Sequence, residues 1–441
     1  MSALAAPSPR PPEDRCPGAL RAHQAADGML VRVRLPGGQL RPAQLRVLAD
    51  LARDESDGAL ELTSRGNLQL RRLADDAAVR RVAGRVADAG LLPTATHERV
   101  RNLLASPLSG RDRAGRLDVR PLVRDLDAAL RGAADLAMLS GRFLFALDDG
   151  RHDVAALGAD LCWTGGSQTL WLAGTDTGLR AGPDDAVELL IAAARAFLRV
   201  RGERRDLWRL ADLPDGPAGV TAALGRPASP VTAPPGTSGA ASAPLASVVA
   251  FPPRTSGGTS APLASVVAAP PGTSGAAPAP VVGARPDGVL VAGVRLGRLT
   301  ADQAHLLADL AGTDEIIVTP WRSLVLDTGG PDIVGRLATA GLLVDPASPW
   351  LGVTACTGRP GCASALADVR GDVTEALGDA GPTGGTALPV HVVGCERRCG
   401  RPAGPAVLAV ATGTGYRIEA GGTSRPGTPA AALAVRAERQ K

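Results

Sequence analysis

Four cysteines near the C-terminal end of the sequence have the type and spacing of metal ligands. They form a C-x5-C pair and a C-x3-C pair separated by 32 residues: Cys356, Cys362, Cys395 and Cys399. Four thiolates can hold either one zinc ion or an iron–sulfur cluster. Structural zinc pairs usually leave about two to four residues between ligands. The longer gap in the first pair therefore favours a [4Fe–4S] cluster, with zinc and unligated thiols as alternatives.

The residues around these cysteines suit an anionic cluster. Gly358, Pro360 and Gly361 predict a tight loop in front of Cys362. We expect Cys362 to begin the next helix, because the dipole and the free N–H groups there favour thiolate and sulfide. Three arginines near the second pair would offset negative charge: Arg397, Arg398 and Arg401.

The remaining cysteines and the histidines form no further metal motif. Cys162 lies between Leu161 and Trp163, which predicts a small buried side chain. Cys16 lies in the turn-like segment RCPGAL, and its role stays open. The histidines lack H-x-x-H and H-E-x-x-H spacing, and each is expected to be structural: His23, His97, His152, His305 and His391.

A polar segment in the first half of the chain, LTSRGNLQLR at 62–71, is interpreted as one β-strand. Side chains alternate between the two faces of a strand, so Leu62, Leu68 and Leu70 should share the apolar face. The opposite face should carry Thr63, Arg65, Asn67, Gln69 and Arg71. Such a face is often only solvated, but arginines interleaved with amides can also hold several carboxylates. A second basic element, Arg101-Asn102, follows in RNLLASPLSG.

The composition narrows the possible chemistry. The single lysine is the terminal Lys441, so catalysis has no internal lysine to use, whereas arginine is well suited to gripping carboxylates. The hydrophobic share is 45% with only 2% aromatic residues, which predicts a core of Leu, Val and Ala. No run of about 18 apolar residues predicts a membrane span, and Met1–Arg15 lacks the apolar region of a secretory signal. We therefore expect a cytoplasmic protein without membrane or nucleic-acid partners.

A low-complexity tract divides the chain. Residues 226–285 are rich in Pro, Ala, Ser, Gly and Thr, and they contain tandem copies of SAPLASVVA and APPGTSGAA. Such a composition buries too little apolar surface to offset the entropy of ordering. The tract is predicted to be a disordered linker.

A longer-range repeat lies on either side of this linker. Residues 38–52 and 297–311 both end in Ala-Asp-Leu-Ala, and each leads into a strand-like segment, 60–70 or 315–326, with Thr63 opposite Thr319. Spacing of three and four residues predicts the buried helix faces: Leu45, Leu48, Ala49 and Ala52 in one helix, and Val79, Val82, Ala83 and Val86 in a second that ends at Gly90. A third helix is expected over 184–201. The pattern predicts an α+β fold with mostly antiparallel sheets, built by duplication.

Together these residues resemble the nitrite/sulfite reductase superfamily. TSRGNLQLR resembles its Thr-x-Arg-x-x-x-Gln strand, RNLLASPLSG its Arg-Asn segment, and C-x5-C with G-C-x3-C its [4Fe–4S] signature. The resemblance implies a pseudo-twofold pair of ferredoxin-like half-domains, each followed by an α/β domain of the nitrite/sulfite reductase type. Arg65 and Arg101 would face the active-site pocket as catalytic residues that bind anionic groups. The expected domains are a tail (1–20), half-domains (21–75 and 286–345), and the domains after them (76–225 and 346–441).

The chain departs from the sulfite and nitrite reductases, which place lysines beside sirohaem to protonate the reduced anion. It is more similar to the oxygenase branch of the superfamily, the precorrin-3B synthases of aerobic cobalamin biosynthesis. That similarity rests on CPGAL (16–20), AADGMLVRVRLPGG (26–38) and TPWRSL (319–324).

This similarity implies a monooxygenase reaction. Electrons from NADH, directly or through a partner reductase, would pass by the cluster to an iron centre, non-haem or sirohaem, that activates O2. Precorrin-3A would be hydroxylated at C20 with closure of a γ-lactone. The expected substrate-binding residues are Arg65, Asn67, Gln69, Arg71, Arg101, Asn102 and Arg322. No G-x-G-x-x-G follows a strand, so NADH is not expected in a Rossmann domain.

Two alternatives remain. A sirohaem-dependent sulfite or nitrite reductase would need arginine to replace lysine, but arginine is a poor proton donor. A zinc-stabilised module that binds anions would need no redox chemistry.

Overall fold

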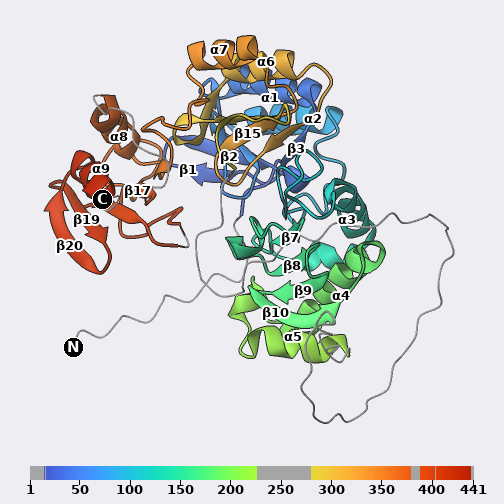
Figure 1. Cartoon of the computed structure of the whole chain (residues 1–441). Helices are drawn as coiled ribbons and strands as arrows, with labels where there is room; N and C mark the ends of the chain where they lie inside the picture. The colour runs from blue at the N-terminus through green and yellow to red at the C-terminus, as the bar shows by residue number, and fades with distance from the viewer. Residues whose placement is uncertain (1–13, 15, 226–279, 379–387, 403, 439–441) are drawn as a thin grey trace, which may run out of the picture.

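The computed structural model describes residues 14, 16–225, 280–378, 388–402 and 404–438 (Figure 1). The described residues form α-helices and four five-stranded sheets, which confirms the predicted α+β class. The repeats of the predicted linker at 226–285 lie outside the described residues. The end of that range does not: β11 already begins the second half at Gly283–Ala284, because it pairs with β12.

Two antiparallel sheets form the centre of the molecule, and each takes an edge strand from the other half of the chain. The first sheet has the order β1 (His23–Ala25), β2 (Gly28–Val33), β5 (Leu68–Leu73), β4 (Ala59–Leu62), β13 (Arg298–Thr300). The second has the order β11, β12 (Leu290–Gly293), β15 (Ser323–Leu326), β14 (Ile316–Val318), β3 (Gln39–Leu40). This exchange interlocks the two halves that the sequence repeat predicted.

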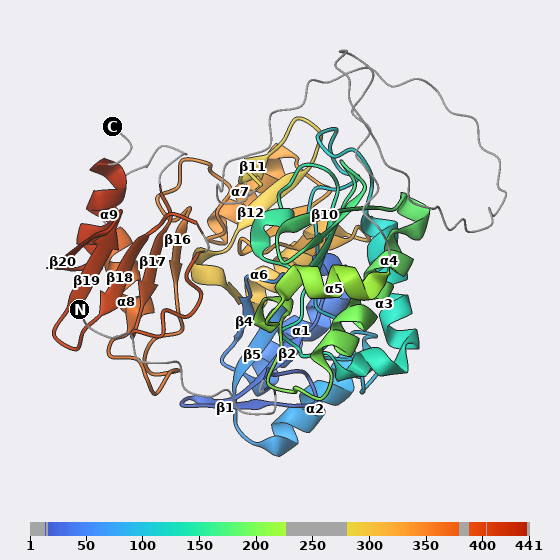
Figure 2. The same cartoon turned by 90° about the horizontal axis from the view of Figure 1, so that it is seen from below.

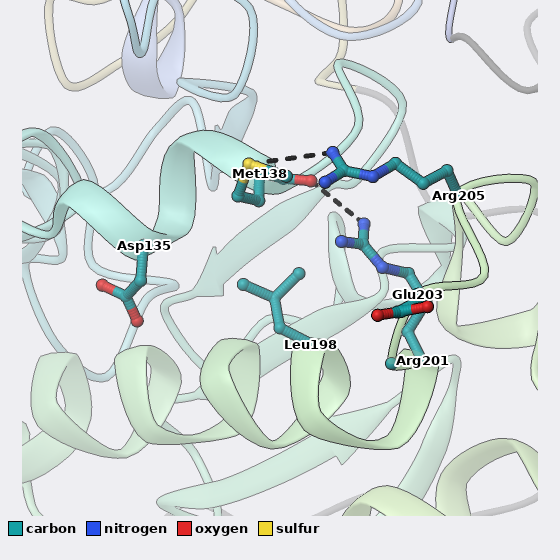
Figure 3. A pocket seen from close by; sticks show the side chains of 7 residues that line it. Asp135, Met138, Leu198, Arg201, Glu203 and Arg205 are labelled. Atoms are coloured by element: carbon teal, nitrogen blue, oxygen red, sulfur yellow. Dashed lines mark hydrogen bonds between the residues drawn. The ribbon is translucent and has the colours of Figure 1, made fainter.

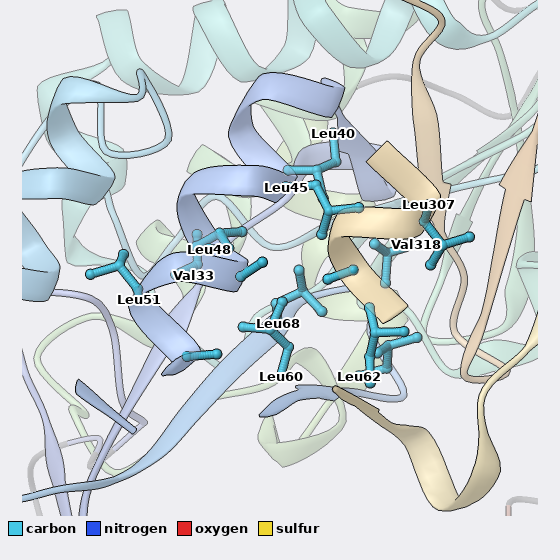
Figure 4. Packing of buried hydrophobic residues seen from close by; sticks show 14 of the residues in the cluster. Val33, Leu40, Leu45, Leu48, Leu51, Leu60, Leu62, Leu68, Leu307 and Val318 are labelled. Atoms are coloured by element: carbon cyan, nitrogen blue, oxygen red, sulfur yellow. The ribbon is translucent and has the colours of Figure 1, made fainter. Parts of the chain in front are cut away.

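Helices cover one face of these sheets and share one core with them. They are α1 (Pro42–Glu55), α2 (Asp76–Asp88), α6 (Ala301–Ala311) and α7 (Pro331–Thr339). Leu45 and Leu48 of α1 lie near Leu307 of α6 and Val318 of β14 (Figure 4). The predicted apolar faces of α1 and α2 are buried. The sequence boundary at 75/76 placed α2 in the following domain, but its valines complete this first core.

The duplication extends to individual hydrogen bonds. Gln44 Oε1 accepts from the N–H of Arg41 at 3.0 Å, while its Nε2 donates to the Ala89 carbonyl at 3.0 Å. Gln303 makes the same two contacts in α6, with Thr300 N–H at 3.0 Å and the Ala340 carbonyl at 2.8 Å. Each glutamine thus ties a helix start to the end of the next helix.

The segment 62–71 is not one strand. β4 ends at Leu62 and β5 begins at Leu68, and the residues between them form a tight turn. Thr63 Oγ1 accepts from the N–H groups of Arg65 and Asn67 at 3.3 and 3.1 Å, which closes the turn. Thr319 closes the equivalent turn in the second half, with Trp321 and Ser323 as donors at 3.2 and 3.3 Å.

Because the chain reverses between Leu62 and Leu68, the predicted polar strand face over 63–71 is wrong. Thr63, Arg65 and Asn67 cannot share a strand face with Gln69 and Arg71, because they lie in the turn rather than in β5. The alternation holds from Leu68 to Leu70 and is then interrupted by a bulge. Arg72 has φ +59° there, and both Leu70 and Leu73 face the core.

The other two sheets repeat a second pattern. The middle domain contains β6 (Leu103–Ala105), β7 (Phe145–Asp148), β8 (Leu161–Thr164), β9 (Thr169–Leu172) and β10 (Thr175–Arg180), with α3 (Arg120–Gly132), α4 (Pro183–Arg201) and α5 (Gly216–Leu224). The cysteine domain contains β16 (Val353–Ala355), β17 (Val390–Val393), β18 (Val407–Ala411), β19 (Tyr416–Ala420) and β20 (Thr423–Gly427), with α8 (Val369–Gly378) and α9 (Pro429–Glu438). In both sheets the first three strands are parallel and the last two pairings are antiparallel.

The middle domain and the cysteine domain both adjoin the central pair of sheets (Figures 1 and 2). Short 3₁₀ turns connect some elements: η1 (Pro36–Gly38), η2 (Ala134–Met138), η3 (Ala155–Leu157), η4 (Leu210–Asp212) and η5 (Arg295–Gly297). None of the described helices combines the length and apolar character that crossing a bilayer requires. Cys162 in β8 is 2% exposed, which confirms its prediction as a small buried side chain.

Candidate active site

A row of polar side chains crosses the first sheet on the face opposite the helices. Register places Arg32 of β2 beside Gln69, Gln69 beside Glu61 of β4, and Glu61 beside Arg298. Gln69 Oε1 accepts from Arg32 Nε at 3.0 Å. The intervening leucines and valines pack on α1 and α2, so this row faces away from the core.

The equivalent row in the second sheet carries no charged residue. It consists of Val291, Val325, Ile317 and Gln39. Its three apolar members pack with Leu108 of the middle domain. The duplicated scaffold therefore keeps a charged face in one copy only, and this face is the candidate for chemistry.

Three guanidinium groups converge at the middle-domain end of this face. Arg34 is 3% exposed and donates to Asn102 Oδ1 and to the Gly141 carbonyl, both at 3.0 Å. Its Nε is buried without a partner among the described atoms. Burial and then the charge of Arg32 lower the pKa of Arg34 to about 9. Burial, followed by the Arg209 charge, lowers the pKa of Arg65 to about 10.

Asn67 and Asn102, which were expected to bind the substrate, support this arginine cluster. Asn67 Oδ1 accepts from the N–H of Leu35 at 2.9 Å, and Asn67 Nδ2 donates to Asn102 Oδ1 at 3.3 Å. Asn102 Nδ2 donates to the Phe143 carbonyl at 3.1 Å. Both amides are at most 1% exposed. Asn102 thus orients Arg34 directly and Asn67 holds Asn102, and neither amide lines an open surface.

Arg101, expected beside Arg65 in the pocket, lies elsewhere. Its guanidinium makes a two-point pair with Asp127 at 2.6 and 3.1 Å and also donates to the Leu91 carbonyl at 3.3 Å. Its side chain is 7% exposed. Asp127 lies on α3, and no sequence pattern indicated that this helix would neutralise Arg101. Arg32 and Arg34 were not among the residues expected at the site, although their alternation in VRVRLPGG matches one face of a strand.

Arg71 lies at the opposite end of the charged face, against the cysteine domain. It donates to Asp27 Oδ1 at 3.0 Å and to the Gly361 carbonyl, inside the C-x5-C loop, at 2.9 Å. Arg370 of α8 reaches back to Glu61 at 2.7 Å. A groove of about 760 Å³ opens between these elements. Its lining includes Arg295, Arg298, Trp350, Thr357, Arg359 and Pro360.

The four cysteines gather at the edge of the cysteine domain. Cys356 Sγ accepts from the N–H of Gly394 at 3.2 Å. Burial raises the pKa of Cys356 and of Cys399, and neighbouring thiols of the set add to this, whereas the backbone N–H groups of Gly394 and Gly358 lower the pKa of Cys356. Within the described part of the chain, no three of their sulfurs meet within 4.8 Å. Zinc–sulfur bonds of about 2.3 Å would draw the sulfurs to about 4 Å apart.

The expected helix at Cys362 begins later. α8 starts at Val369, and Cys362 instead opens a turn in which its carbonyl accepts from the N–H of Ala365 at 3.0 Å. The second cysteine pair is oriented by His391, which is fully buried. Burial lowers the pKa of His391 to about 4, so the ring is neutral at neutral pH. Its Nε2 therefore donates to the Cys399 carbonyl at 2.9 Å, and Nδ1 accepts from Thr354 at 2.8 Å.

The remaining predicted arginines differ in their surroundings. Arg322 has φ +59° and its guanidinium lies beside Gly400, next to Cys399. Burial lowers its pKa, and the Arg370 charge adds to this. Arg398 pairs with Glu419 at 2.9 Å, so its charge is already met. Arg397 is exposed and lowers the pKa of Cys399 against the effect of burial.

Two further features lie away from this site. A hollow of about 550 Å³ at the end of α4 contains Arg201 and Arg205, which donate to the carbonyl and sulfur of Met138 (Figure 3). Three buried carboxylates also meet in the middle domain: Asp148, Asp149 and Asp153. Asp149 pairs with Arg151 at 2.7 Å, and Asp148 accepts four backbone N–H bonds. Contacts within the fold thus account for the three carboxylates.

Comparison with known proteins bears on this arrangement. The family model "Nitrite/Sulfite reductase ferredoxin-like half domain" matches residues 21–80. Residues 21–80 are a nitrite/sulfite reductase half domain. The match spans α1 and the strands β1, β2, β4 and β5 of the charged sheet, and it confirms the resemblance drawn from TSRGNLQLR. The second half repeats this half domain in topology.

Relatives agree with this assignment. The chain is 27% identical over 434 residues to a precorrin-3B synthase from Sinorhizobium sp, covering 94% of this chain and 84% of that protein. It is 28% identical over 193 residues to a ferredoxin–nitrite reductase from Synechococcus elongatus, covering 41% of this chain and 38% of the relative. The solved structure of Mycobacterium tuberculosis NirA has the same fold, with a TM-score of 0.62 and 22% identity over 89% of this chain and 74% of NirA. These relatives are a precorrin-3B synthase and a nitrite reductase, and their similarity supports the interpretation of this chain as an oxidoreductase.

Proposed function

We propose that this chain is an iron–sulfur monooxygenase of the precorrin-3B synthase type. It hydroxylates precorrin-3A at C20 and closes a γ-lactone, using O2 and electrons that originate from NADH. The observation that carries this proposal is the charged face of the first half domain. That face offers guanidinium groups and no lysine, as a tetrapyrrole bearing many carboxylates requires. It also adjoins the loop between Cys356 and Cys362, through the bond from Arg71 to Gly361.

The four cysteines fit a [4Fe–4S] cluster better than a zinc ion. Their C-x5-C spacing exceeds the roughly two to four residues usual between zinc ligands, and among the described residues no three of the sulfurs meet within 4.8 Å. Gly394 N–H donates to Cys356 Sγ, and the neutral His391 ring holds the Cys399 carbonyl, so both loops are oriented for ligation. When bound, the cluster supplies single electrons to the reaction.

The chain's own residues would bind and orient the substrate. Arg32, Arg34 and Arg65 present guanidinium groups that lack a carboxylate partner among the described residues, and such groups bind carboxylates strongly. Asn67 and Asn102 fix Arg34 in position. The groove beside Arg71 has room for the part of the substrate nearest the cysteine loop. The oxygen-activating iron, non-haem or sirohaem, belongs to the same proposal.

A sirohaem-dependent nitrite or sulfite reductase is the second candidate, since other relatives are nitrite reductases. That reaction needs a proton donor beside the anion. Burial lowers the pKa of Arg34 to about 9, so its guanidinium remains protonated at neutral pH. The site therefore binds anions more readily than it delivers protons, which favours the monooxygenase.

Anaerobic purification followed by iron, sulfide and zinc analysis tests the cluster. We expect brown protein with about four cluster irons per chain. Colourless protein with one zinc would instead support the anion-binding module. Incubation with precorrin-3A, NADH, a reductase and ¹⁸O2 should give a product that contains one labelled oxygen atom. Reduction of sulfite without turnover of precorrin-3A would establish the reductase.

Cys395→Ser tests both measurements, and Cys162→Ser is its matched control. The Cys395→Ser protein should lose the cluster absorbance and the oxygenase activity together. Cys162→Ser changes a buried cysteine of the middle domain and should keep both. Retained activity in Cys395→Ser would mean that the cluster ligands are misassigned.

A further inference from the structure

A hollow in the middle domain carries positive charge that the proposed oxygenase reaction does not use. It has a volume of about 550 Å³ and lies where α4 ends. Figure 3 shows the guanidinium groups of Arg201 and Arg205 turned toward Met138. Arg201 Nη1 donates to the Met138 carbonyl at 3.0 Å, and Arg205 Nη1 lies 3.8 Å from the Met138 sulfur. Two cations therefore converge on one residue of the hollow.

Neither of these cations is paired with a carboxylate. Among the described residues, no carboxylate oxygen lies within 4.0 Å of the Arg201 or Arg205 nitrogens. Asp135 also lines the hollow, but it is paired with Arg195 at 2.8 Å. Glu203, the other carboxylate of the lining, is exposed to solvent. The hollow thus has positive charge to spare.

Arg201 combines burial with a donor that a ligand can reach. The residue is 8% exposed, and its Nε is enclosed without a partner. Its Nη2 makes no hydrogen bond within the described structure, but protein atoms do not enclose it. Burial lowers the pKa of Arg201, and the Arg205 charge adds to this. A donor left unmet costs free energy, which an anion in the hollow would recover.

The hollow also offers apolar surface. Leu198 lines it half-buried, and Met138 is 40% exposed. Sites for small organic molecules commonly have volumes of about 300–1,000 Å³. The carbonyl end of α4 is partly negative, but two full positive charges outweigh it. The chemistry therefore fits a small molecule that joins one carboxylate to an apolar body.

A short piece of chain joins the hollow to the arginines of the candidate active site. It begins at Met138, whose carbonyl is held from the hollow. The Gly141 carbonyl accepts from Arg34 at 3.0 Å, and the Arg142 carbonyl accepts from Arg65 at 3.1 Å. An anion that draws the donor away from the Met138 carbonyl would loosen the segment that orients both active-site arginines.

We propose that the hollow is an accessory binding site for small amphipathic carboxylates, and that its occupancy weakens substrate binding through residues 138–142. Arg201 and Arg205 bind the carboxylate, while Leu198 and Met138 contact the apolar body. The effect on the substrate rests on the proposed function. Binding in the hollow does not.

Calorimetric titration of the holoenzyme with 2-naphthoate tests the site, and 2-naphthamide is the uncharged control ligand. We expect the carboxylate to bind about tenfold or more tightly than the amide, because hydrogen bonds between charged groups are the stronger kind. Saturable binding that is equal for the two ligands, or no saturable binding of 2-naphthoate, would overturn the proposal.

Variants locate the bound carboxylate. Arg201→Gln and Arg205→Gln should each weaken 2-naphthoate binding by about tenfold. Arg204→Gln is the matched control, because Arg204 is an exposed neighbour that pairs with Asp206 at 2.9 Å, and it should keep the affinity. Circular dichroism verifies the fold of Arg201→Gln. Unchanged affinity in Arg205→Gln, whose side chain is exposed, would place the ligand elsewhere and overturn the assignment.

Anaerobic binding of precorrin-3A, with and without saturating 2-naphthoate, tests the link. We expect about fivefold or more weaker binding when the hollow is occupied, which is the usual scale of coupling between two sites. Arg205→Gln should remove this effect and Arg204→Gln should keep it. An unchanged affinity for precorrin-3A would refute the link. If the chain binds no precorrin-3A at all, the proposed function fails while the titration of the hollow stands.

Discussion

Arg71 of the first half domain donates a hydrogen bond to the carbonyl oxygen of Gly361, in the loop between Cys356 and Cys362, at 2.9 Å. The same Nη2 donates to Asp27 Oδ1 at 3.0 Å. Arg71 and Gly361 are 290 positions apart in the sequence, and the Arg71 side chain is 8% exposed. One buried guanidinium therefore couples the charged sheet to the conformation of the cysteine loop.

Replacing Arg71 by glutamine should loosen that loop. The change leaves a buried Asp27 with a weaker partner, and breaking a buried pair costs about 3–5 kcal/mol. We expect a lower melting temperature and fewer irons per chain after gel filtration. Arg72→Gln is the control, since its side chain is 43% exposed and such pairs contribute about 1 kcal/mol or less. Equal iron content in the two variants would contradict the coupling.

Binding of precorrin-3A should depend on Arg34 and Arg65 and not on Arg101. Arg34→Gln and Arg65→Gln should each weaken anaerobic binding by about tenfold or more, because hydrogen bonds to charged groups contribute about 1.5–3 kcal/mol. Arg101→Gln should instead lower the melting temperature, since it breaks the buried pair with Asp127. Titration and thermal unfolding of each variant measure both effects. A folded Arg101→Gln protein with the larger loss of binding would return Arg101 to the site.

His391 should influence how firmly the cluster is held. His391→Leu removes the donor to the Cys399 carbonyl and the acceptor for Thr354, and unpaired buried groups cost about 1–3 kcal/mol. We expect faster bleaching of the cluster absorbance by a chelator. His305→Gln provides the matched control, because His305 bonds to Asp50 at the contact of α1 with α6. Identical bleaching rates would exclude a positioning role for His391.

Asp153 should make stability depend on pH with a definite sign. Burial raises its pKa to about 7, and Asp148 and Asp149 add to the increase although Ser106 opposes it. Between about pH 4 and pH 7 the folded chain binds a proton that the unfolded chain has lost, so stability falls as pH rises. Asp153→Asn removes the free-energy cost of ionising this buried carboxyl group. We expect its stability advantage over the unmodified chain to widen by about 2–3 kcal/mol from pH 5 to pH 8.

Chemical denaturation at both pH values measures that gap. The exposed Asp135→Asn provides a control, because Arg195 lowers the pKa of Asp135 instead. A constant gap for Asp153→Asn would mean that Asp153 is ionised throughout this range.

Local pattern was sufficient to predict much of the scaffold. The apolar spacing in 38–52 and 297–311 predicted two buried helix faces, and Leu45 and Leu48 are indeed fully buried. The aligned repeats predicted Thr63 opposite Thr319, and both close the same turn. Period and repetition act over a few neighbouring residues, so they can be recognised in a sequence without knowledge of its partners.

The site depended on contacts that local pattern does not contain. A turn at 63–67 removed Arg65 from the strand face, and Asp127 neutralised Arg101 from a separate helix. The tertiary structure also brought Asp14 and Cys16 against Gly141, where the sequence showed only a turn. The sequence by itself determined the residue types, the duplication and the cysteine spacing. Only the tertiary structure decided which charges are paired and which stay available, because a charged side chain finds its partner in space rather than along the chain.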